Sequence, residues 1–497
     1  MLAAKAPPAL RLDSILVRAL TAAALIVLLA ACGRALVLFA QHARLALEFP
    51  YTLNYGEGPL LDQAVRLSRG AEIYQPDLSV PPYTIANYPP LYPLIQAPFV
   101  SIFGAAFWYG RLISVVSCIA AALFLGLTVR ALTRDWLAAL VAALTLLAIP
   151  YLFSWSALAR IDSLALALAW AGLFAIVQGR GTRLSLIAGI VLLAAAAYTR
   201  QTYLLAAPLA AFAWLVGNKL GGRGLIFAAY FAALVTVVFA ALTAITEGGI
   251  FFHIITANVN TLDPGIIGYY AAELGAHLPI FLALGGLMLI IGLIVDRRTW
   301  SLTAPYALGA VIVALTISKV GSDVNYLYEL GATFALSAGV WVAWTRRVPL
   351  LRAALLLLIA GGVIMASDLS ASKYQPILEE RVNAGAHLEE LVAFVAGTDA
   401  PILADEHMAL LTLAGKPIRL QPFELSQLAV AGMWDETPFL NDLRGGTYPY
   451  ILIYQPYRNP NLRRERWTPA MLREINAHYR PLLQSAETIV YEYFRSN

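Results

Sequence analysis

The feature that most constrains this chain is a series of apolar runs that recur from residue 15 to residue 366. The runs are near the length of about 20 residues that an α-helix needs to cross the hydrocarbon core of a bilayer. They predict about eleven membrane-spanning helices, at residues 15–39, 109–130, 136–153, 163–178, 184–199, 202–217, 224–246, 276–295, 301–318, 325–345 and 350–366. The composition agrees, because 60% of the 497 residues are hydrophobic and only 13% are charged, whereas soluble domains carry about 25% charged residues. We therefore expect a polytopic α-helical membrane protein.

Basic residues give these spans a direction, because cytoplasmic connections are enriched in Lys and Arg. If the N-terminus with Lys5 and Arg11 lies inside, every predicted inner connection is basic. These connections carry Arg130, Arg134, Arg180, Arg183, Lys219, Arg223, Arg297, Arg298, Arg346 and Arg347. The loops 40–108, 247–275 and 318–324, together with the polar tail, then face outward. The apolar but proline-containing stretch 89–104 is short, and we interpret it as an interfacial or re-entrant piece.

The start of the chain permits a second interpretation. The sequence LAACG at 29–33 fits a lipoprotein cleavage box with Cys32 as the lipidated residue. Apolar sequence continues through Ala40, however, and the following spans need a first partner, which favours a membrane span. Cys32 and Cys118 both lie in apolar spans and indicate no disulfide framework.

The sequence divides into a membrane domain at residues 1–366, with its outer loop at 40–108, and a tail at residues 367–497. Short apolar runs in the tail at 401–404, 450–454 and 488–493 predict strands, separated by helix-compatible segments such as EERVNAGAHLEELVAFV. We expect a small extracytoplasmic α/β domain. The net charge is +4, and the basic residues are distributed over the predicted inner connections rather than gathered in one patch. The sequence therefore offers no support for nucleic-acid binding.

An acidic turn follows the first span, in the sequence NYGEGPLLDQA at 54–64. Gly56 and Gly58 allow a sharp turn and the close approach of another molecule, and a helix-compatible segment follows. Glu57 is therefore predicted to be a carboxylate presented at the start of a surface helix. The alternative is that Glu57 is only an N-terminal capping acid and that Asp62 is solvated.

Three basic residues lie at outer span ends, against the general distribution of charge: Arg160, Arg200 and Lys319. Their coincidence predicts an anion held at the outer leaflet, because Arg binds phosphate in a bidentate manner and Lys acts as a point charge. The polar neighbours of these residues, which complete the predicted substrate-binding set, are Tyr88, Asp162, Asn325 and Glu329. The alternative is local pairing, Arg160 with Asp162 or Lys319 with Asp323, together with snorkelling to lipid headgroups.

In their order along the chain, several short motifs resemble the membrane-embedded GT-C glycosyltransferases, and within them the bacterial family 39 and RgtA/B/C/D-like group. The motifs are YGEGPLLDQAVRLSRGAEIY, YPPLYPL, FWYGRLISVVS, ARIDSLALAL and YTRQTYL. The resemblance covers residues 40–220 and continues more loosely through GSDVNYLYEL and the tail. It implies a GT-C-like fold and the transfer of a sugar from a polyprenyl-phosphate donor to a glycan, lipid or protein acceptor. It also implies a multi-pass protein of the bacterial cytoplasmic membrane, with the N-terminus inside and the C-terminal domain outside among membrane lipids.

The resemblance also implies roles for particular residues. Members place an acid of the first outer loop at the catalytic centre, and the matching residue here is Glu57. Many members carry an Asp-Glu pair there, or a basic residue just before the double proline, where this chain has Gly56-Glu57 and Asn87-Tyr88. The cofactor is therefore left open, since a divalent metal has no clear ligand set.

The chemistry of an inverting single displacement assigns the remaining roles. Glu57 is expected to be the general base that takes the acceptor proton. Arg160 and Arg200 are expected to bind the leaving phosphate, with Lys319 as a third cation. Asp62 and Asp162 are expected to orient these groups.

Two other classes of function are compatible with the sequence. A transporter or flippase of a lipid-linked sugar would be expected to place ionisable residues near mid-span and to show repeated halves. Here the charges lie at the outer ends and no such repeat is found. A non-catalytic subunit that binds a partner through its tail is the third class.

Overall fold

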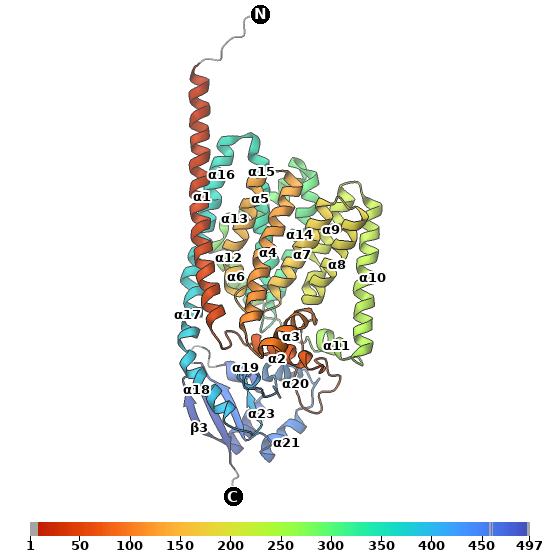
Figure 1. The fold of residues 1–497 in the computed structure, drawn as a ribbon, viewed down its shortest axis with the longest axis vertical. Coiled ribbons are helices and arrows are strands. Elements are labelled where there is room, and N and C mark those ends of the chain that lie inside the picture. The colour runs from red at the N-terminus through yellow and green to blue at the C-terminus, as the bar shows by residue number, and fades with distance from the viewer. Residues whose placement is uncertain (1–7, 457–458, 460, 495–497) are drawn as a thin grey trace, which may run out of the picture.

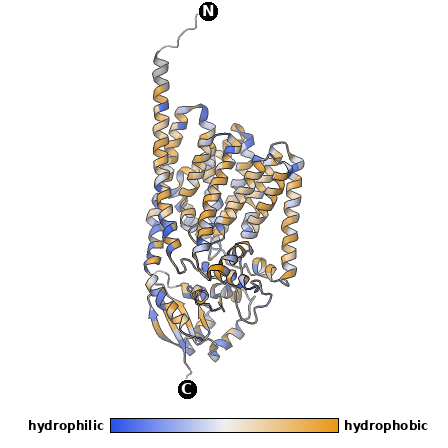
Figure 2. Ribbon diagram, viewed as in Figure 1, coloured by the Kyte–Doolittle hydropathy of each residue, from blue (hydrophilic) through white to orange (hydrophobic). Residues whose placement is uncertain are grey.

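The computed structural model describes residues 8–456, 459 and 461–494. A bundle of apolar helices runs along the long axis of the molecule, and a smaller part that contains a β-sheet is attached to one end of it (Figure 1). Hydrophobic residues dominate the helices of the bundle, whereas polar residues are more frequent at its two ends and in the smaller part (Figure 2). This is the predicted arrangement of a helical membrane domain and a small α/β domain.

The helices of the bundle follow the apolar runs of the sequence. They are α1 (Pro8–Glu48), α4 (Trp108–Thr133), α5 (Trp136–Ala148), α6 (Pro150–Trp155), α7 (Asp162–Gln178), α8 (Arg183–Thr199), α9 (Ala206–Gly217), α10 (Gly221–Ile245), α13 (Pro279–Val295), α14 (Arg297–Leu315), α15 (Tyr328–Trp344) and α16 (Pro349–Leu369). Short 3₁₀ or π segments adjoin some of them, namely η1 (Gln201–Leu204), η3 (Thr316–Ser318), η4 (Val324–Leu327), η5 (Thr345–Arg347) and η6 (Ser370–Tyr374).

By length and composition alone, five helices of the described chain are long and apolar enough to cross a membrane. A sixth is obtained if α12 (Pro264–His277) and α13, which are bent by 99° at their junction, form one broken span. Several of the other predicted spans are shorter apolar helices, including α5, α7 and α8. The polytopic helical fold is thus confirmed, whereas the number of eleven spans stays a prediction.

Small residues allow the central helix α15 to approach its neighbours closely. A Cβ atom on Gly339 would lie 2.7 Å from both the Ala138 carbonyl oxygen and the Ala142 Cβ of α5. A Cβ atom on Gly309 of α14 would lie 2.5 Å from the Ala206 Cα of α9. Close backbone packing through small residues is a general source of helix association in membranes, where hydrophobicity alone does not favour one apolar partner over another.

Four short helices lie where the bundle meets the smaller part. They are α2 (Glu57–Ser68), α3 (Leu91–Phe103), α11 (Gly249–Phe251), which continues into η2 (Phe252–Thr256), and α12. Helix α3 occupies the stretch predicted as an interfacial piece and packs beside α2 (Figure 1). Together these helices bring the loops 40–108 and 247–275, both predicted to face outward, to the same end of the bundle.

The C-terminal part contains a four-stranded sheet with helices on either side. The strands are β1 (Ile402–Ala404), β2 (Tyr450–Tyr454), β3 (Tyr479–Ser485) and β4 (Thr488–Tyr493), in the order β1-β2-β4-β3, with β1 parallel to β2 and the other pairs antiparallel. The helices are α17 (Gln375–Asn383), α18 (Gly385–Ala396), α19 (Ala409–Leu413), α20 (Pro422–Val430), α21 (Thr437–Gly445), α22 (Leu462–Arg466) and α23 (Pro469–His478). The three predicted strands are confirmed. Strand β3 was missed because it is an edge strand with a proline and mostly exposed residues, which gives no apolar run.

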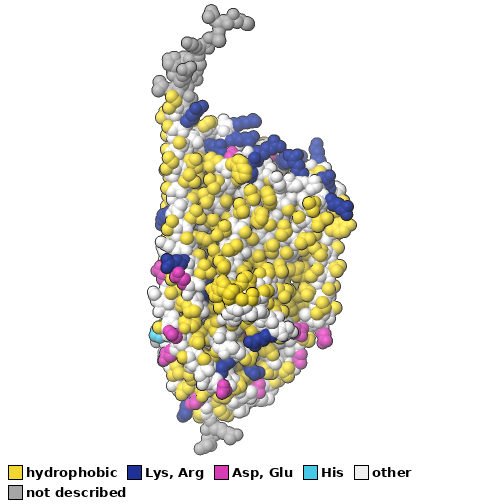
Figure 3. Space-filling model, in the orientation of Figure 1, with side chains coloured by type: hydrophobic (Ala, Val, Ile, Leu, Met, Phe, Trp, Pro, Cys, Tyr) yellow, Lys and Arg dark blue, Asp and Glu magenta, His cyan; other side chains and the backbone are white. Residues whose placement is uncertain are grey.

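Basic side chains gather at the end of the bundle that lies opposite the C-terminal part, above a broad hydrophobic band (Figure 3). The connections at that end are those for which the sequence predicts an inner location. The long loops and the tail lie together at the other end (Figure 1). The two ends of the bundle are therefore chemically distinct.

The packing of α15 gives a test of the fold. Gly339→Val is expected to lower the free energy of unfolding by about 1–3 kcal/mol, because the added atoms overlap the backbone of α5. Gly286→Val is the matched control, since Gly286 is also inside a helix but a Cβ there meets nothing within 4 Å. Thermal unfolding in detergent, followed by tryptophan fluorescence, measures both, and equal midpoints would contradict the packing.

Candidate functional site

Glu57 is the first residue of α2, and its side chain is fully buried. Its Oε1 accepts hydrogen bonds from Arg111 Nε at 2.9 Å and from the Ala159 amide at 2.7 Å. Its Oε2 accepts from Arg111 Nη2 at 2.8 Å and from the Leu53 amide at 2.7 Å. Four donors thus surround the carboxylate. Glu57 does not line the cavity that is described below.

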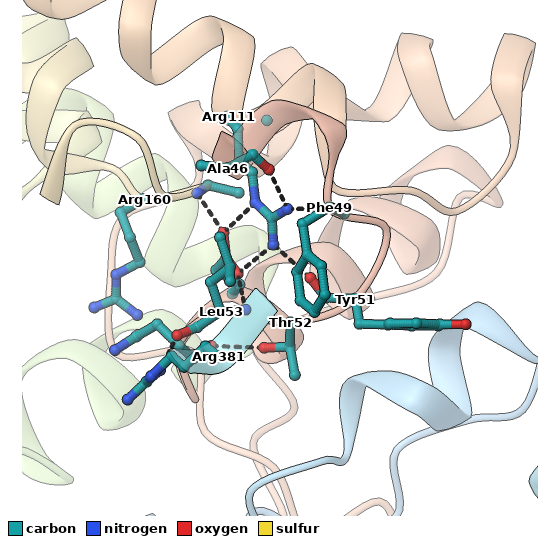
Figure 4. Close-up of polar contacts among 12 residues, drawn as sticks. Ala46, Phe49, Tyr51, Thr52, Leu53, Arg111, Arg160 and Arg381 are labelled. Atoms are coloured by element: carbon teal, nitrogen blue, oxygen red, sulfur yellow. Dashed lines mark hydrogen bonds and ion pairs between the residues drawn. The ribbon is translucent and has the colours of Figure 1, made fainter. Parts of the chain in front are cut away.

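Arg111 of α4 ties this carboxylate to the end of α1. Its buried guanidinium also donates to the carbonyl oxygens of Ala46 at 2.7 Å, Phe49 at 2.5 Å and Tyr51 at 2.6 Å (Figure 4). The last carbonyls of a helix lack intrahelical partners and carry partial negative charge. Arg111 satisfies one such carbonyl, that of Ala46, and two carbonyls just beyond the helix while it is paired with Glu57, so three segments of the chain meet at one buried point.

The environment of Glu57 keeps it ionised. Burial raises the pKa of this carboxyl, but the charge and hydrogen bonds of Arg111 and the backbone amides of Ala159 and Leu53 outweigh it, so the pKa lies below its ordinary value. A carboxylate with a lowered pKa and four donors is a weak base.

Gly56 precedes Glu57. The Arg160 guanidinium occupies the space that a side chain at position 56 would fill. A Cβ atom built on Gly56 would lie 1.3 Å from Arg160 Nη1. A guanidinium therefore stands where related sequences are expected to carry a carboxylate. The residues at this point do not fit a divalent cation, because Gly56 offers no side-chain oxygen and a positive charge is already present. Among the described residues, no group of three or more His, Cys, Asp or Glu side chains could hold a metal ion.

Arg160 is a buried cation that forms no ion pair with the described residues. It is 8% exposed, its Nε has no hydrogen-bond partner, and its Nη2 donates to the Tyr88 hydroxyl at 3.3 Å. In Figure 4 its side chain extends beside the Arg111 cluster. The local pair with Asp162 is not formed, because Asp162 pairs with Arg200. Burying an unpaired charge is costly, so Arg160 is suited to an anion that is not part of the chain.

A cavity of about 190 Å³ opens beside Arg160. We call it the cation cavity, because Arg160 and Lys319 both line it. Four predicted site residues meet in its wall: Tyr88, Arg160, Lys319 and Asn325. Lys319 Nζ donates to Asn258 Oδ1 at 3.1 Å and forms no ion pair with Asp323 or another described carboxylate. Other wall residues are Asn54, Tyr55, Gln63, Trp155, Gln201, His253, Asn260, Asp323, Tyr326, Phe423 and Glu424.

Asp162 and Arg200 form a buried ion pair behind this wall. Asp162 also accepts hydrogen bonds from Trp155 Nε1 at 2.7 Å and from Asn325 Nδ2 at 3.1 Å. The Tyr326 ring covers Arg200, with 4.4 Å between its centroid and Arg200 Cζ. Arg200 therefore holds two wall residues in place and has no contact of its own with the cavity.

The other two predicted residues lie away from the cation cavity. Asp62 lines a separate small cavity with Arg66 and Lys416, and burial raises its pKa to about 6. Glu329 lies in the first turn of α15 and is 2% exposed, and neither of its oxygens has a hydrogen-bond partner among the described residues. This placement gives neither residue direct contact with a molecule in the cation cavity.

The carboxylates that do line the cation cavity are Asp323 and Glu424, and neither was among the predicted site residues. Asp323 precedes η4, four residues after Lys319, and the sequence offered it only as a local partner of that lysine. Glu424 lies in the first turn of α20, where its Oε2 accepts a hydrogen bond from the Tyr55 hydroxyl at 2.7 Å. No pattern in the sequence distinguishes Glu424 from the other acids of the tail.

Residues 87–246 match the family model described as dolichyl-phosphate-mannose-protein mannosyltransferase. The matched segment covers less than half of the chain but contains Tyr88, Arg111, Arg160, Asp162 and Arg200. No curated protein sequence matches the chain.

Solved structures resemble the chain over almost its full length. The apo structure of ArnT from Cupriavidus metallidurans has a TM-score of 0.58 at 14% identity, covering 92% of this chain and 97% of that chain. ArnT bound to undecaprenyl phosphate gives 0.57 at 15% identity, with 93% and 97% covered. The Archaeoglobus fulgidus oligosaccharyltransferase tethered with an acceptor peptide gives 0.51 at 12% identity, with 93% and 74% covered. These likenesses confirm the GT-C-like fold without singling out the family 39 or RgtA/B/C/D-like group.

The different surroundings of Glu57 and Arg160 predict effects of different size on stability. Glu57→Gln is expected to lower the free energy of unfolding by about 3–5 kcal/mol, because it leaves the buried Arg111 charge uncompensated. Arg160→Gln removes a buried charge that forms no ion pair within the described part of the chain, so little or no loss is expected. Thermal unfolding in the absence of ligand measures both variants.

A double-mutant cycle then isolates the pair. Glu57→Gln with Arg111→Gln is expected to cost less than the sum of the single changes, because neither charge is left alone. Additive losses, or an equal loss in Arg160→Gln, would contradict a structural ion pair at Glu57.

Proposed function

We propose that the chain is a membrane glycosyltransferase that moves a sugar from a polyprenyl-phosphate donor to an acceptor, at the end of the bundle that carries the C-terminal part. The observation that carries this proposal is Arg160, a buried cation in the wall of a polar cavity that has no ion-pair partner among the described residues. The matches to a mannosyltransferase family model and to ArnT bound to undecaprenyl phosphate support the same class of donor.

Charge arithmetic fits a phosphate leaving group. A sugar linked through phosphate to a lipid carries one negative charge, and cleavage of the bond between the sugar carbon and the phosphate oxygen adds a second. Fixed cations lower the barrier when they face the atoms on which charge develops. Arg160 and Lys319 supply two positive charges to the cavity wall, and the Tyr88 hydroxyl accepts a hydrogen bond from the Arg160 guanidinium.

The buried residues behind the wall take supporting roles in this proposal. Glu57 holds the Ala159 amide, and thereby the backbone directly before Arg160, so it positions the cation rather than acting as the base. Arg200 and Asp162 similarly hold Asn325 and Tyr326. Each of these contacts is made within the protein, so the residues behind the wall hold the groups that line the cavity.

A lipid-linked donor also accounts for the location of the site. The cavity lies at the end of an apolar bundle, where the phosphate of a long-chain lipid meets water while its isoprenoid tail stays in hydrocarbon. We assign this end to the outer face of the bacterial cytoplasmic membrane, because the opposite end carries the basic connections (Figure 3).

Cysteine labelling tests this orientation. Asp435→Cys, on the exposed surface of the C-terminal part, is expected to react with a membrane-impermeant maleimide in intact spheroplasts. Gly222→Cys, exposed at the opposite end, is the matched control and is expected to react only after the membrane is permeabilised. The reverse pattern would place the cavity inside.

The phosphate site is tested by binding of undecaprenyl phosphate to purified protein. Arg160→Gln and Lys319→Gln are each expected to weaken binding about 10- to 100-fold, the loss of a charge-assisted hydrogen bond. Arg183→Gln makes the same change of charge at the basic end and is expected to leave the affinity unchanged. An equal effect in all three would contradict a phosphate site in the cation cavity.

Turnover separates an enzyme from a transporter. Purified wild type is expected to release undecaprenyl phosphate from at least one donor in a panel of undecaprenyl-phosphate-linked hexoses and pentoses. If no donor is consumed while labelled donor changes leaflet in proteoliposomes, the chain is a flippase.

A further inference from the structure

A second cavity, also of about 190 Å³, lies beside the cation cavity, between the end of α1, α6 and α17. Its wall includes His42, Leu158, Ile377 and Arg381. Three residues line both cavities, and these are Asn54, Trp155 and Asp323. These three residues therefore lie between the two cavities. Asp323 is the one among them that carries a carboxylate.

The carboxylate of Asp323 is less engaged than the other candidates. Its Oδ1 accepts a hydrogen bond from the Val324 amide at 2.7 Å, and it forms no ion pair with the described residues. The Glu57 carboxylate, in contrast, accepts four hydrogen bonds. Glu424 is bonded to Tyr55 and lines the cation cavity but not the second one.

His253 is the histidine in the wall of the cation cavity, and both of its ring nitrogens are engaged. Its Nδ1 accepts a hydrogen bond from the Ala86 amide at 2.9 Å, which leaves Nε2 to donate to the Gln75 carbonyl at 2.9 Å. Burial also lowers its pKa to about 4. The imidazole is thus neutral and has no free lone pair for a substrate.

We propose that Asp323 is the general base of the transfer, with the donor phosphate in the cation cavity and the acceptor group arriving from the second cavity. This assignment rests on the proposed function. In the step, the acceptor oxygen or nitrogen forms a bond to the anomeric carbon, and its proton passes to the Asp323 carboxylate. The bond between the anomeric carbon and the phosphate oxygen breaks, and its electron pair leaves with the polyprenyl phosphate.

The surroundings of Asp323 suit this role. Burial raises the pKa of Asp323, against the opposing influence of the Val324 amide and the charges of Arg160, Arg381 and Lys373. A carboxylate with a raised pKa accepts a proton more readily, and proton transfer is most effective when the pKa of the base approaches the working pH. Its place on a short loop directly before η4 fixes the backbone while leaving the side chain between the cavities.

The role of Asp323 as the base is tested with a nucleophile that needs no base. With an undecaprenyl-phosphate-linked sugar that wild type consumes, Asp323→Ala is expected to release undecaprenyl phosphate about 10²- to 10⁴-fold more slowly when water is the acceptor. Sodium azide carries no proton to remove, so it should restore release and yield the glycosyl azide. Asp323→Asn is expected to lose the reaction with water to a similar extent.

Controls separate this role from damage to the fold. Asp323→Ala and Asp323→Asn should bind undecaprenyl phosphate within about 3-fold of wild type and unfold at a similar temperature. Asp435→Asn, an exposed acid far along the tail, is expected to keep full activity. Rescue by azide is itself a readout that a misfolded or merely weakened protein would not give.

The remaining outcomes contradict either the assignment of Asp323 or the proposed function. If Asp323→Asn turns over like wild type, or if Glu424→Gln alone loses the reaction with water and regains it with azide, the base is not Asp323. Loss of activity without azide rescue would also count against it. If wild type consumes no donor in the panel, the proposed function fails, and this assignment fails with it.

Discussion

The buried ion pair of Glu57 and Arg111 is the interaction on which the end of the bundle next to the C-terminal part depends. It closes the carbonyl end of α1, fixes the first turn of α2, and holds the backbone at Ala159. Every donor and acceptor of the pair is used within the protein, which is the condition under which burying two charges is tolerated. The polar cavity next to it is built on this point, since Gly56 and Arg160 are the direct neighbours of Glu57 and Ala159.

The sequence was sufficient for the helical membrane class and for most of the sheet, because long apolar runs and short alternating ones each have few structural solutions. It also identified Arg160, Lys319 and Asn325 as residues that belong together, from their shared place at predicted outer span ends, and added Tyr88 from the predicted outer loop. It did not reveal which way each side chain points. Helix α15 is buried nearly all round, so no amphipathic pattern marks the face that carries Glu329.

The sequence alone could not decide which role Glu57 takes, for a physical reason. A conspicuous acid between two glycines is compatible with an exposed catalytic group and with a buried structural one, and only its partner decides between them. That partner, Arg111, follows 54 residues later and is indistinguishable in the sequence from a basic residue at a span end. Glu424 reaches the cavity from 369 residues beyond Tyr55, a proximity that no local pattern encodes.

The C-terminal part is joined to the cavity by side chains, not only by the chain. Phe423 and Glu424 of α20 form a section of its wall, and the Phe423 ring fills the space beside Gly321 so closely that a Cβ there would lie 2.6 Å away. The Tyr83 backbone also pairs with Leu420. The C-terminal part completes the wall of the cavity, so it cannot be exchanged for an unrelated domain. A domain joined only by a linker could be exchanged. Changes in the tail and in the loops of the bundle are therefore expected to occur together during evolution, and a chimaera that joins this bundle to a foreign tail would inherit an open, incomplete chamber.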